Sequence, residues 1–228
     1  MTTQNGDCLT LFAQLATDSI DCIITDPPYG ISYKSHKQGQ STRSGKTIST
    51  GKEEYFTEIA NDESLPTSWL SEAYRVLKDG SAMYVFCHWS TWNELTTIAT
   101  AVGFKLKNMI VLNKSNWGMG DLKGAYAPKH ELLLFATKGR HIMNVPPRLP
   151  DVWDVPVLDS RRKRRHPNEK SIDWLLPAIK QSTKEGDTIL DPFAGSGSTG
   201  AAAKHADRNF ILFEIDPEYY KVCIERLK

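Results

Sequence analysis

The sequence lacks long apolar runs, and no stretch approaches the roughly 18 apolar residues of a membrane-spanning helix. Its N-terminus also lacks a basic region followed by an apolar run, so we expect no secretion signal. Cysteine is scarce: the four residues (Cys8, Cys22, Cys87 and Cys223) show no CxxC spacing, which argues against a disulfide framework and a zinc site. These absences predict a cytoplasmic protein with reduced thiols, no bound metal and no membrane partner.

A strong net charge of either sign is also lacking: the chain has 28 Lys and Arg residues and 27 acidic residues, a net charge of +1. The overall balance therefore gives no reason to expect a polyanionic partner, but the local distribution does. No acidic residue lies between Pro27 and Lys52, a stretch that contains several basic residues, and residues 161–165 read RRKRR. With 40% hydrophobic residues, the 228-residue chain can bury one substantial core, which indicates a single domain.

Short apolar runs of the β type alternate with helical segments along most of the chain, which predicts an α/β protein with a mainly parallel sheet. A helix over 68–80 is expected to stop at a glycine, and further helices are expected in the alanine-rich 198–206 and at 217–228. The expected strands cover residues 21–25, 81–87, 107–113, 130–139, 187–191 and 209–216.

Two long segments interrupt this alternation. Residues 31–60 are rich in Ser, Thr, Gly and Lys, which in a compact domain indicates a mobile functional loop. Residues 140–165 are first rich in proline and then basic. Neither segment has the composition to form a core of its own.

Two motifs carry chemical information. "IITDPPYG" (23–30) places an acid, two prolines and an aromatic ring at the exit of an expected buried strand, where a simple proline-rich turn is the plainer interpretation. "ILDPFAGSGSTGAAA" (189–203) reads as a strand, a glycine turn and a helix of small residues, which lets a ligand approach the backbone. It has neither GxGxxG nor the Gly-Lys-Ser/Thr of a phosphate-binding loop.

Glu214, at the end of the next expected strand, can accept hydrogen bonds from a ribose diol. A nucleoside cofactor without a pyrophosphate fits this pattern, and S-adenosylmethionine is the obvious candidate.

Together, "DPPY" and "DPFAGSGSTG" resemble the DNA amino-methyltransferases, which methylate exocyclic amines of adenine or cytosine. The catalytic motif precedes the cofactor motif, as in the circularly permuted β group of that family. "NGDCLTLFAQL" resembles the family's third cofactor strand, and "HPNEKS" (166–171) resembles its HPxxKP element, although Ser171 replaces the usual proline and Glu169 a common glutamine. The resemblance implies a single-domain Rossmann-like methyltransferase fold over residues 1–228, with a mixed sheet and helices on both faces.

The resemblance also implies roles for individual residues. Asp26, Pro27, Pro28 and Tyr29 would be catalytic. The cofactor would be bound by Asp7, Cys8, Asp26, His166, Lys170, Asp191, Phe193, Ala194, Gly195, Gly197, Ser198 and Glu214. The alternative interpretation of Asp7 is a cap on a helix that begins near Leu9, and that of Asp191 is an ordinary turn residue.

DNA is the implied partner, with residues 31–60 as a catalytic and DNA-binding loop and 140–165 as a short basic target-recognition segment. The expected DNA contacts are Lys34, Lys37, Arg43, Lys46, Arg161, Arg162, Arg164 and Arg165. So short a recognition region predicts a short or degenerate target site. A homodimer remains open.

The proposed chemistry explains the DPPY residue types. An exocyclic amine is a poor nucleophile because its lone pair is delocalised into the ring. The hydrogen bonds that it donates to Asp26 and to the Pro27 carbonyl would strengthen as positive charge develops on the nitrogen. Tyr29 would stack on the flipped base. An Asp at the first position of this motif resembles the motif of the adenine-N6 enzymes. The resemblance therefore implies methylation of adenine N6, as carried out by the methyltransferases of restriction–modification systems. Cytosine-N4 methylation, RNA or protein methylation, and an inactive nucleic-acid-binding protein on the same fold remain as alternatives.

Overall fold

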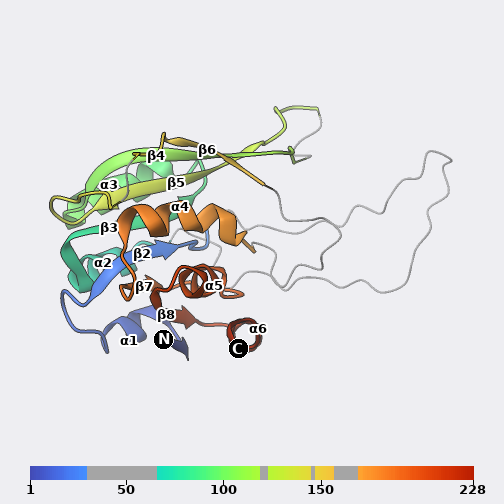
Figure 1. Cartoon of the computed structure of the whole chain (residues 1–228). Coiled ribbons are helices and arrows are strands. Elements are labelled where there is room, and N and C mark those ends of the chain that lie inside the picture. The colour runs from blue at the N-terminus through green and yellow to red at the C-terminus, as the bar shows by residue number, and fades with distance from the viewer. Residues whose placement is uncertain (30–65, 119–122, 145–146, 157–168) are drawn as a thin grey trace, which may run out of the picture.

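The computed structural model describes residues 1–29, 66–118, 123–144, 147–156 and 169–228. The described strands form an eight-stranded sheet in the order β1-β8-β7-β2-β3-β5-β4-β6 (Figure 1). The strands are β1 (Thr2–Asn5), β2 (Ile20–Thr25), β3 (Leu77–Cys87), β4 (Lys105–Lys114), β5 (His130–Thr137), β6 (Val152–Val155), β7 (Thr188–Asp191) and β8 (Asn209–Glu214). The helices are α1 (Cys8–Phe12), α2 (Trp69–Val76), α3 (Trp92–Val102), α4 (Ile172–Ser182), α5 (Ser198–His205) and α6 (Pro217–Leu227).

The sheet is mixed. Strands β1, β8, β7, β2 and β3 are all parallel to one another, whereas β5 runs antiparallel to both β3 and β4, and β6 is parallel to β4. The carboxyl ends of five neighbouring strands therefore meet at one edge of the sheet, which is where doubly wound folds bind their ligands.

Helices cover both faces of the sheet, and the alternation of side chains along the strands explains why. On β2, Cys22 and Ile24 point into a core shared with α4, α5 and α6, while Ile23 points into a second core shared with α1, α2 and α3. All three side chains are fully buried. Figure 1 shows α4 and α5 on the near side of the strands and α2 and α3 behind them. The expected α/β fold is confirmed.

The helix expected over 68–80 is shorter than predicted, because α2 ends at Val76 and β3 begins at the next residue. Leu77 has extended backbone angles (φ −70°, ψ 132°), is fully buried and pairs with Ile20 of β2. Gly80 is no helix stop. It lies inside β3 with φ +80° and donates its N–H to the carbonyl of Lys138, in the irregular stretch where the β2–β3 register shifts.

Segment 140–165 contains a strand that the composition did not predict. Val152–Val155 pairs with β4 at the edge of the sheet, and Val155 is buried. The run is too short, and too closely surrounded by proline and aspartate, to stand out as a strand in the sequence. None of the helices in the described ranges is long and apolar enough to cross a membrane, and those ranges hold no cluster of three metal-ligating acids, histidines or cysteines.

Candidate active site

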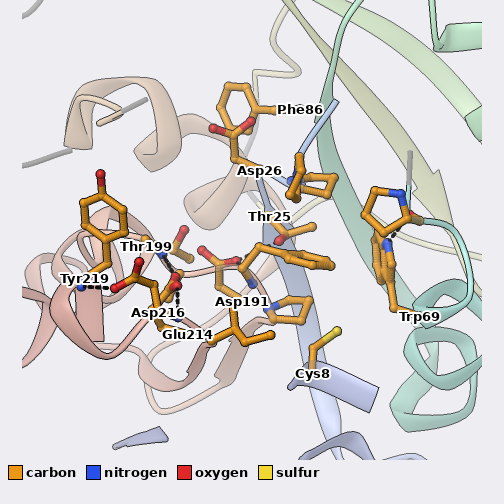
Figure 2. Close-up of a pocket in the computed structure, with 18 of the residues that line it drawn as sticks. Cys8, Thr25, Asp26, Trp69, Phe86, Asp191, Thr199, Glu214, Asp216 and Tyr219 are labelled. Atoms are coloured by element: carbon orange, nitrogen blue, oxygen red, sulfur yellow. Dashed lines mark hydrogen bonds between the residues drawn. The ribbon is translucent and has the colours of Figure 1, made fainter. Parts of the chain in front are cut away.

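One cavity opens at the carboxyl ends of β1, β8, β7 and β2, where the two sequence motifs meet (Figure 2). Its walls combine carboxylates with apolar and aromatic side chains, which suits a ligand that is partly polar and partly a flat heterocycle. The lining residues that the argument below uses are Asp7, Cys8, Thr25, Asp26, Pro27, Pro28, Trp69, Phe86, Lys170, Asp191, Phe193, Ala194, Gly195, Ser198, Thr199, Glu214, Asp216 and Tyr219.

The glycine turn after β7 has the backbone that its sequence predicts. Gly195 and Gly197 have φ values of +53° and +77°, a region that disfavours residues with a Cβ. At Gly197 a Cβ would also lie 2.6 Å from the Sγ of Cys223 on α6. The turn therefore requires glycine for its conformation, and at Gly197 also for close packing.

Asp191 connects the two motifs. Its Oδ1 accepts hydrogen bonds from the hydroxyl of Thr25, at 2.7 Å, and from the backbone N–H of Phe193, at 3.0 Å. Burial raises the pKa of Asp191 to about 6, although hydrogen bonds from Thr199, Thr25 and Phe193 favour the ionised form. The carboxylate is therefore a buried group that titrates close to neutral pH.

Glu214, the last residue of β8, closes the same wall. Its carboxylate accepts from the N–H of Gly195 at 2.6 Å and from the N–H of Asp216 at 2.9 Å. Burial raises its pKa above the ordinary value, and the two backbone hydrogen bonds oppose that shift. Each carboxylate oxygen has a further lone pair, so hydrogen bonds from a ribose diol remain available to it.

Asp7 and Cys8 form the start of α1, shortly after the strand residue Asn5 that pairs with Glu214. Asp7 caps this helix, accepting from the N–H groups of Leu9 and Thr10 at 2.9 and 3.3 Å, and it also lines the cavity. Asp7 thus both caps α1 and lines the cavity. Burial and the neighbouring Asp7 raise the pKa of Cys8 to about 11, so this thiol is neutral rather than nucleophilic.

Asp26, directly after β2, belongs to a chain of partly buried charges. Its Oδ1 accepts from the hydroxyl of Tyr29 at 2.6 Å, and its Oδ2 lies 3.1 Å from the ammonium of Lys170. Lys170 also contacts Glu131 of β5 at 2.8 Å, and Lys114 of β4 lies 3.5 Å from the same carboxylate. Burial raises the pKa of Asp26, and Lys170 and Tyr29 reduce that rise.

Tyr29 lies beside the cavity, and its phenol is held in the neutral, donating form. Burial and the negative charges of Asp26 and Glu131 raise its pKa well above the usual value. Its ring is nearly parallel to the imidazole of His88, with centroids 6.5 Å apart. The aromatic ring that the sequence assigns to base stacking thus lies next to a second ring that follows β3.

The structure brings most of the predicted site residues together around this cavity. These are Asp7, Cys8, Asp26, Pro27, Pro28, Lys170, Asp191, Phe193, Ala194, Gly195, Ser198 and Glu214, while Tyr29 and Gly197 adjoin it. His166, Lys34, Lys37, Arg43, Lys46, Arg161, Arg162, Arg164 and Arg165 lie outside the described residues, as do the loop at 31–60 and the basic end of 140–165.

Sequence reasoning missed several members of the site. Trp69, at the start of α2, packs edge-on against Phe193 with ring centroids 5.6 Å apart, and no local motif marks it. Thr25 could have been found, because it directly precedes the DPPY motif. Glu131 stands in "PKHELLLF", a run that looks like an ordinary strand edge. Its role depends on a contact with Lys170, 39 residues away.

A mixed α/β sheet with five neighbouring parallel strands, a glycine turn at one strand end, an acid at the next, and Asp-Pro-Pro-Tyr beside them defines a nucleoside-cofactor-dependent methyltransferase. The DNA methylase family model for N6 and N4 amines matches residues 20–225, so this chain belongs to the DNA amino-methyltransferase family. It is a DNA methyltransferase.

Curated relatives support this membership over nearly the whole chain. A putative methylase YubD of Escherichia coli K12 is 32% identical over 97% of this chain and 88% of its own length. The type II methyltransferase M2.DpnII of Streptococcus pneumoniae is 28% identical over 98% of this chain and 88% of its own length.

Solved structures support the fold. The chain is similar to a complex of M1.HpyAVI with S-adenosylmethionine, at 24% identity and a TM-score of 0.72, over 99% of both chains. It is also similar to the cytosine-N4-specific PvuII DNA methyltransferase, at 16% identity and a TM-score of 0.76, over 100% of this chain and 86% of that one.

S-adenosylmethionine is the methyl donor of this family and the cofactor of this chain. The cavity fits it on two observations. Several carboxylates line the cavity, which favours a cationic sulfonium. Trp69 and Phe193 offer apolar surface to an adenine ring, and the backbone at Gly195 permits close approach.

Proposed function

We propose that this chain methylates the exocyclic N6 amine of adenine in DNA. The observation that carries the proposal is the hydrogen bond of 2.7 Å between Thr25 and Asp191, which are 166 residues apart in sequence. It fixes the end of the strand that carries Asp26 beside the end of the strand that carries the glycine turn. A target amine bound at Asp26 is thereby adjacent to a methyl donor held over the turn.

Asp26 and the carbonyl of Pro27 act as acceptors for the two amine hydrogens. Both hydrogen bonds strengthen as the nitrogen becomes positive, so they favour the transition state over the ground state. Bound S-adenosylmethionine supplies an electrophilic methyl group. The methyl carbon would bond to the amine nitrogen as its bond to sulfur breaks, so that S-adenosylhomocysteine leaves and the methylated amine releases one proton to solvent. The base must leave the duplex to reach Asp26, and Tyr29 with His88 offers it aromatic surface.

Adenine is favoured over cytosine by the aspartate at the first position of the DPPY motif, which resembles the adenine enzymes. Cytosine-N4 methylation is the second candidate, because the same carboxylate serves either amine and the fold is shared with the cytosine-N4-specific PvuII enzyme. The basic segments 31–60 and 140–165 would contact DNA. A catalytically inactive DNA-binding protein is disfavoured by the complete set of acceptors around Asp26.

Mass spectrometry of nucleosides distinguishes these functions. DNA is incubated with the protein and S-adenosylmethionine carrying an isotopically labelled methyl group, digested, and analysed. Labelled N6-methyladenine is expected. Labelled N4-methylcytosine would show that cytosine is the target instead of adenine. The absence of any labelled nucleoside from the DNA would refute the function.

The two motifs have separable effects. Asp26→Ala should abolish most methyl transfer while cofactor affinity stays nearly unchanged, because Asp26 acts on the amine. Glu214→Ala should weaken cofactor binding, because it removes the acceptor beside Gly195. Calorimetry with S-adenosylhomocysteine and the nucleoside assay measure the two quantities. If Asp26→Ala lost the cofactor and Glu214→Ala kept it, the assignment of the motifs would be reversed.

A further inference from the structure

Lys170 is held by two carboxylates from different parts of the fold. Its ammonium lies 3.1 Å from Asp26 after β2 and 2.8 Å from Glu131 on β5, and its side chain is only 9% exposed. It also lies 4.7 Å from the ring centroid of Phe86, a cation–π contact that occupies another side of the ammonium. The positive charge of Lys170 is thus directed at protein groups.

These contacts change the expected role of Lys170. The resemblance assigns this residue to the cofactor wall, and it does line the cavity. The charge of a buried cation with two carboxylate partners is already neutralised, so a third anion adds little stabilisation. Its pKa is raised because Asp26 and Glu131 more than offset the effect of burial, so it stays protonated across the pH range of activity.

The titratable groups around Asp26 come from four strands and two adjoining segments. Lys170 precedes α4, Tyr29 follows β2, Glu131 lies on β5, and Lys114 on β4 reaches Glu131. Asp191 on β7 and Cys87 on β3 are the remaining titratable neighbours. Within the described residues, Lys170 is the cation in contact with Asp26.

We propose that Lys170 is a positioning residue for methyl transfer, which acts through Asp26 by keeping its carboxylate ionised and oriented, and that Glu131 anchors Lys170 in place. The inference rests on the proposed function, because it concerns the acceptor of the target amine.

The physical reason is the number of acceptors that the amine requires. An ionised carboxylate only accepts hydrogen bonds, whereas a protonated one carries a donor that competes with the amine hydrogens. Burial favours the protonated, inactive form of Asp26, and Lys170 opposes it. Glu131 holds Lys170, but its own negative charge raises the pKa of Asp26. The two partners therefore have opposite electrostatic effects on the same carboxylate.

The test is the pH profile of kcat at saturating cofactor and DNA, measured by transfer of labelled methyl groups. Lys170→Met should lower kcat several-fold and shift the acidic limb of the profile to higher pH. Glu131→Gln, which can still accept from Lys170, should shift the acidic limb to lower pH. Lys170→Arg keeps the charge and should restore most of the wild-type profile.

Lys78→Met is the matched control. Lys78 on β3 pairs with Asp21 on β2 at 2.6 Å, at the opposite end of the strand that leads to Asp26. Its removal should leave the profile unchanged. Lys170→Met leaves Asp26 without its cation and Glu131 with Lys114 alone, and this loss of charge pairing can prevent folding. Glu131→Gln and Lys170→Arg then carry the test by themselves.

The outcomes separate this inference from the proposed function. If the wild-type protein methylates no DNA amine, the proposed function fails before any variant is compared. If it does so and both Lys170→Met and Glu131→Gln leave the acidic limb in place, the positioning role is overturned. The same holds if Lys170→Met weakens binding of S-adenosylhomocysteine without moving the limb, which would assign Lys170 to the cofactor.

Discussion

The protonation state of Asp191 affects the stability of the fold. Its folded-state pKa of about 6 lies above the ordinary value of 3.8. The folded protein therefore binds more protons than the unfolded chain between these two values, so the contribution of Asp191 is fully present below pH 3.8. Stability is lost as the pH rises through this window toward 6.

Asp191→Asn should remove this dependence. Since one pKa unit corresponds to about 1.4 kcal/mol, the free energy of unfolding of the variant relative to wild type should rise by about 2 kcal/mol from pH 4 to pH 7. Urea unfolding of both proteins at several pH values in this range measures the difference. A difference that stays constant with pH would show that Asp191 is ionised throughout.

At the residue scale, the sequence predicted the acidic site residues that stand at the ends of strands. It did not predict Glu131, which reaches the site only through the tertiary pairing of its strand. Asp26, Asp191 and Glu214 each end a recognisable apolar run, so their meeting at one sheet edge follows from parallel strand order. Glu131 begins its strand instead. Its place beside Asp26 depends on the antiparallel course of β5, which its own neighbours in sequence do not specify.

At the scale of elements, the turn between β7 and α5 combines two demands on Gly197. Its φ of +77° is strained for other residues, and a Cβ would meet Cys223. Gly186, before β7, has a similar φ of +83°, but no atom lies within 4 Å of where its Cβ would be. A comparison of substitutions at Gly186 and Gly197 therefore separates the cost of backbone strain from the cost of steric conflict.

Gly186→Ala should cost about 1 kcal/mol of unfolding free energy, from its backbone alone. Gly197→Ala should cost about 1–3 kcal/mol more, because α6 must move away from the turn. It should also weaken cofactor binding, which Gly186→Ala should not. Urea unfolding and calorimetry provide the two measurements. Equal losses in the two variants would mean that Cys223 moves aside without cost.

Element boundaries were less predictable than element types. The helix expected to 80 stops at Val76 because Leu77 fills a fully buried position opposite Ile20, and tertiary pairing outweighs the local helical pattern. The edge strand β6 was not predicted for a related reason. Its pairing with β4 stabilises a four-residue run that has no strong pattern of its own.

At the scale of the whole molecule, DNA affinity is predicted to come from the basic segments of the sequence. Replacing Arg161, Arg162, Arg164 and Arg165 with Ala should weaken DNA binding and flatten its dependence on salt. Each lost phosphate contact removes roughly 0.9 from the log–log slope. As a control, Lys105→Ala with Lys107→Ala removes exposed cations from the start of β4, away from the active-site edge, and should leave the slope unchanged. An unchanged slope for the arginine variant would make RRKRR an ordinary solvated surface.

The two ends of the described chain lie close together in the fold. β1 pairs with β8, and α6, which follows β8, packs against β1 (Figure 1). The last helix therefore returns to the edge from which the first strand departs. β1, β8 and α6 thus form one packed unit, and Glu214 at the end of β8 brings this unit to the wall of the cofactor cavity.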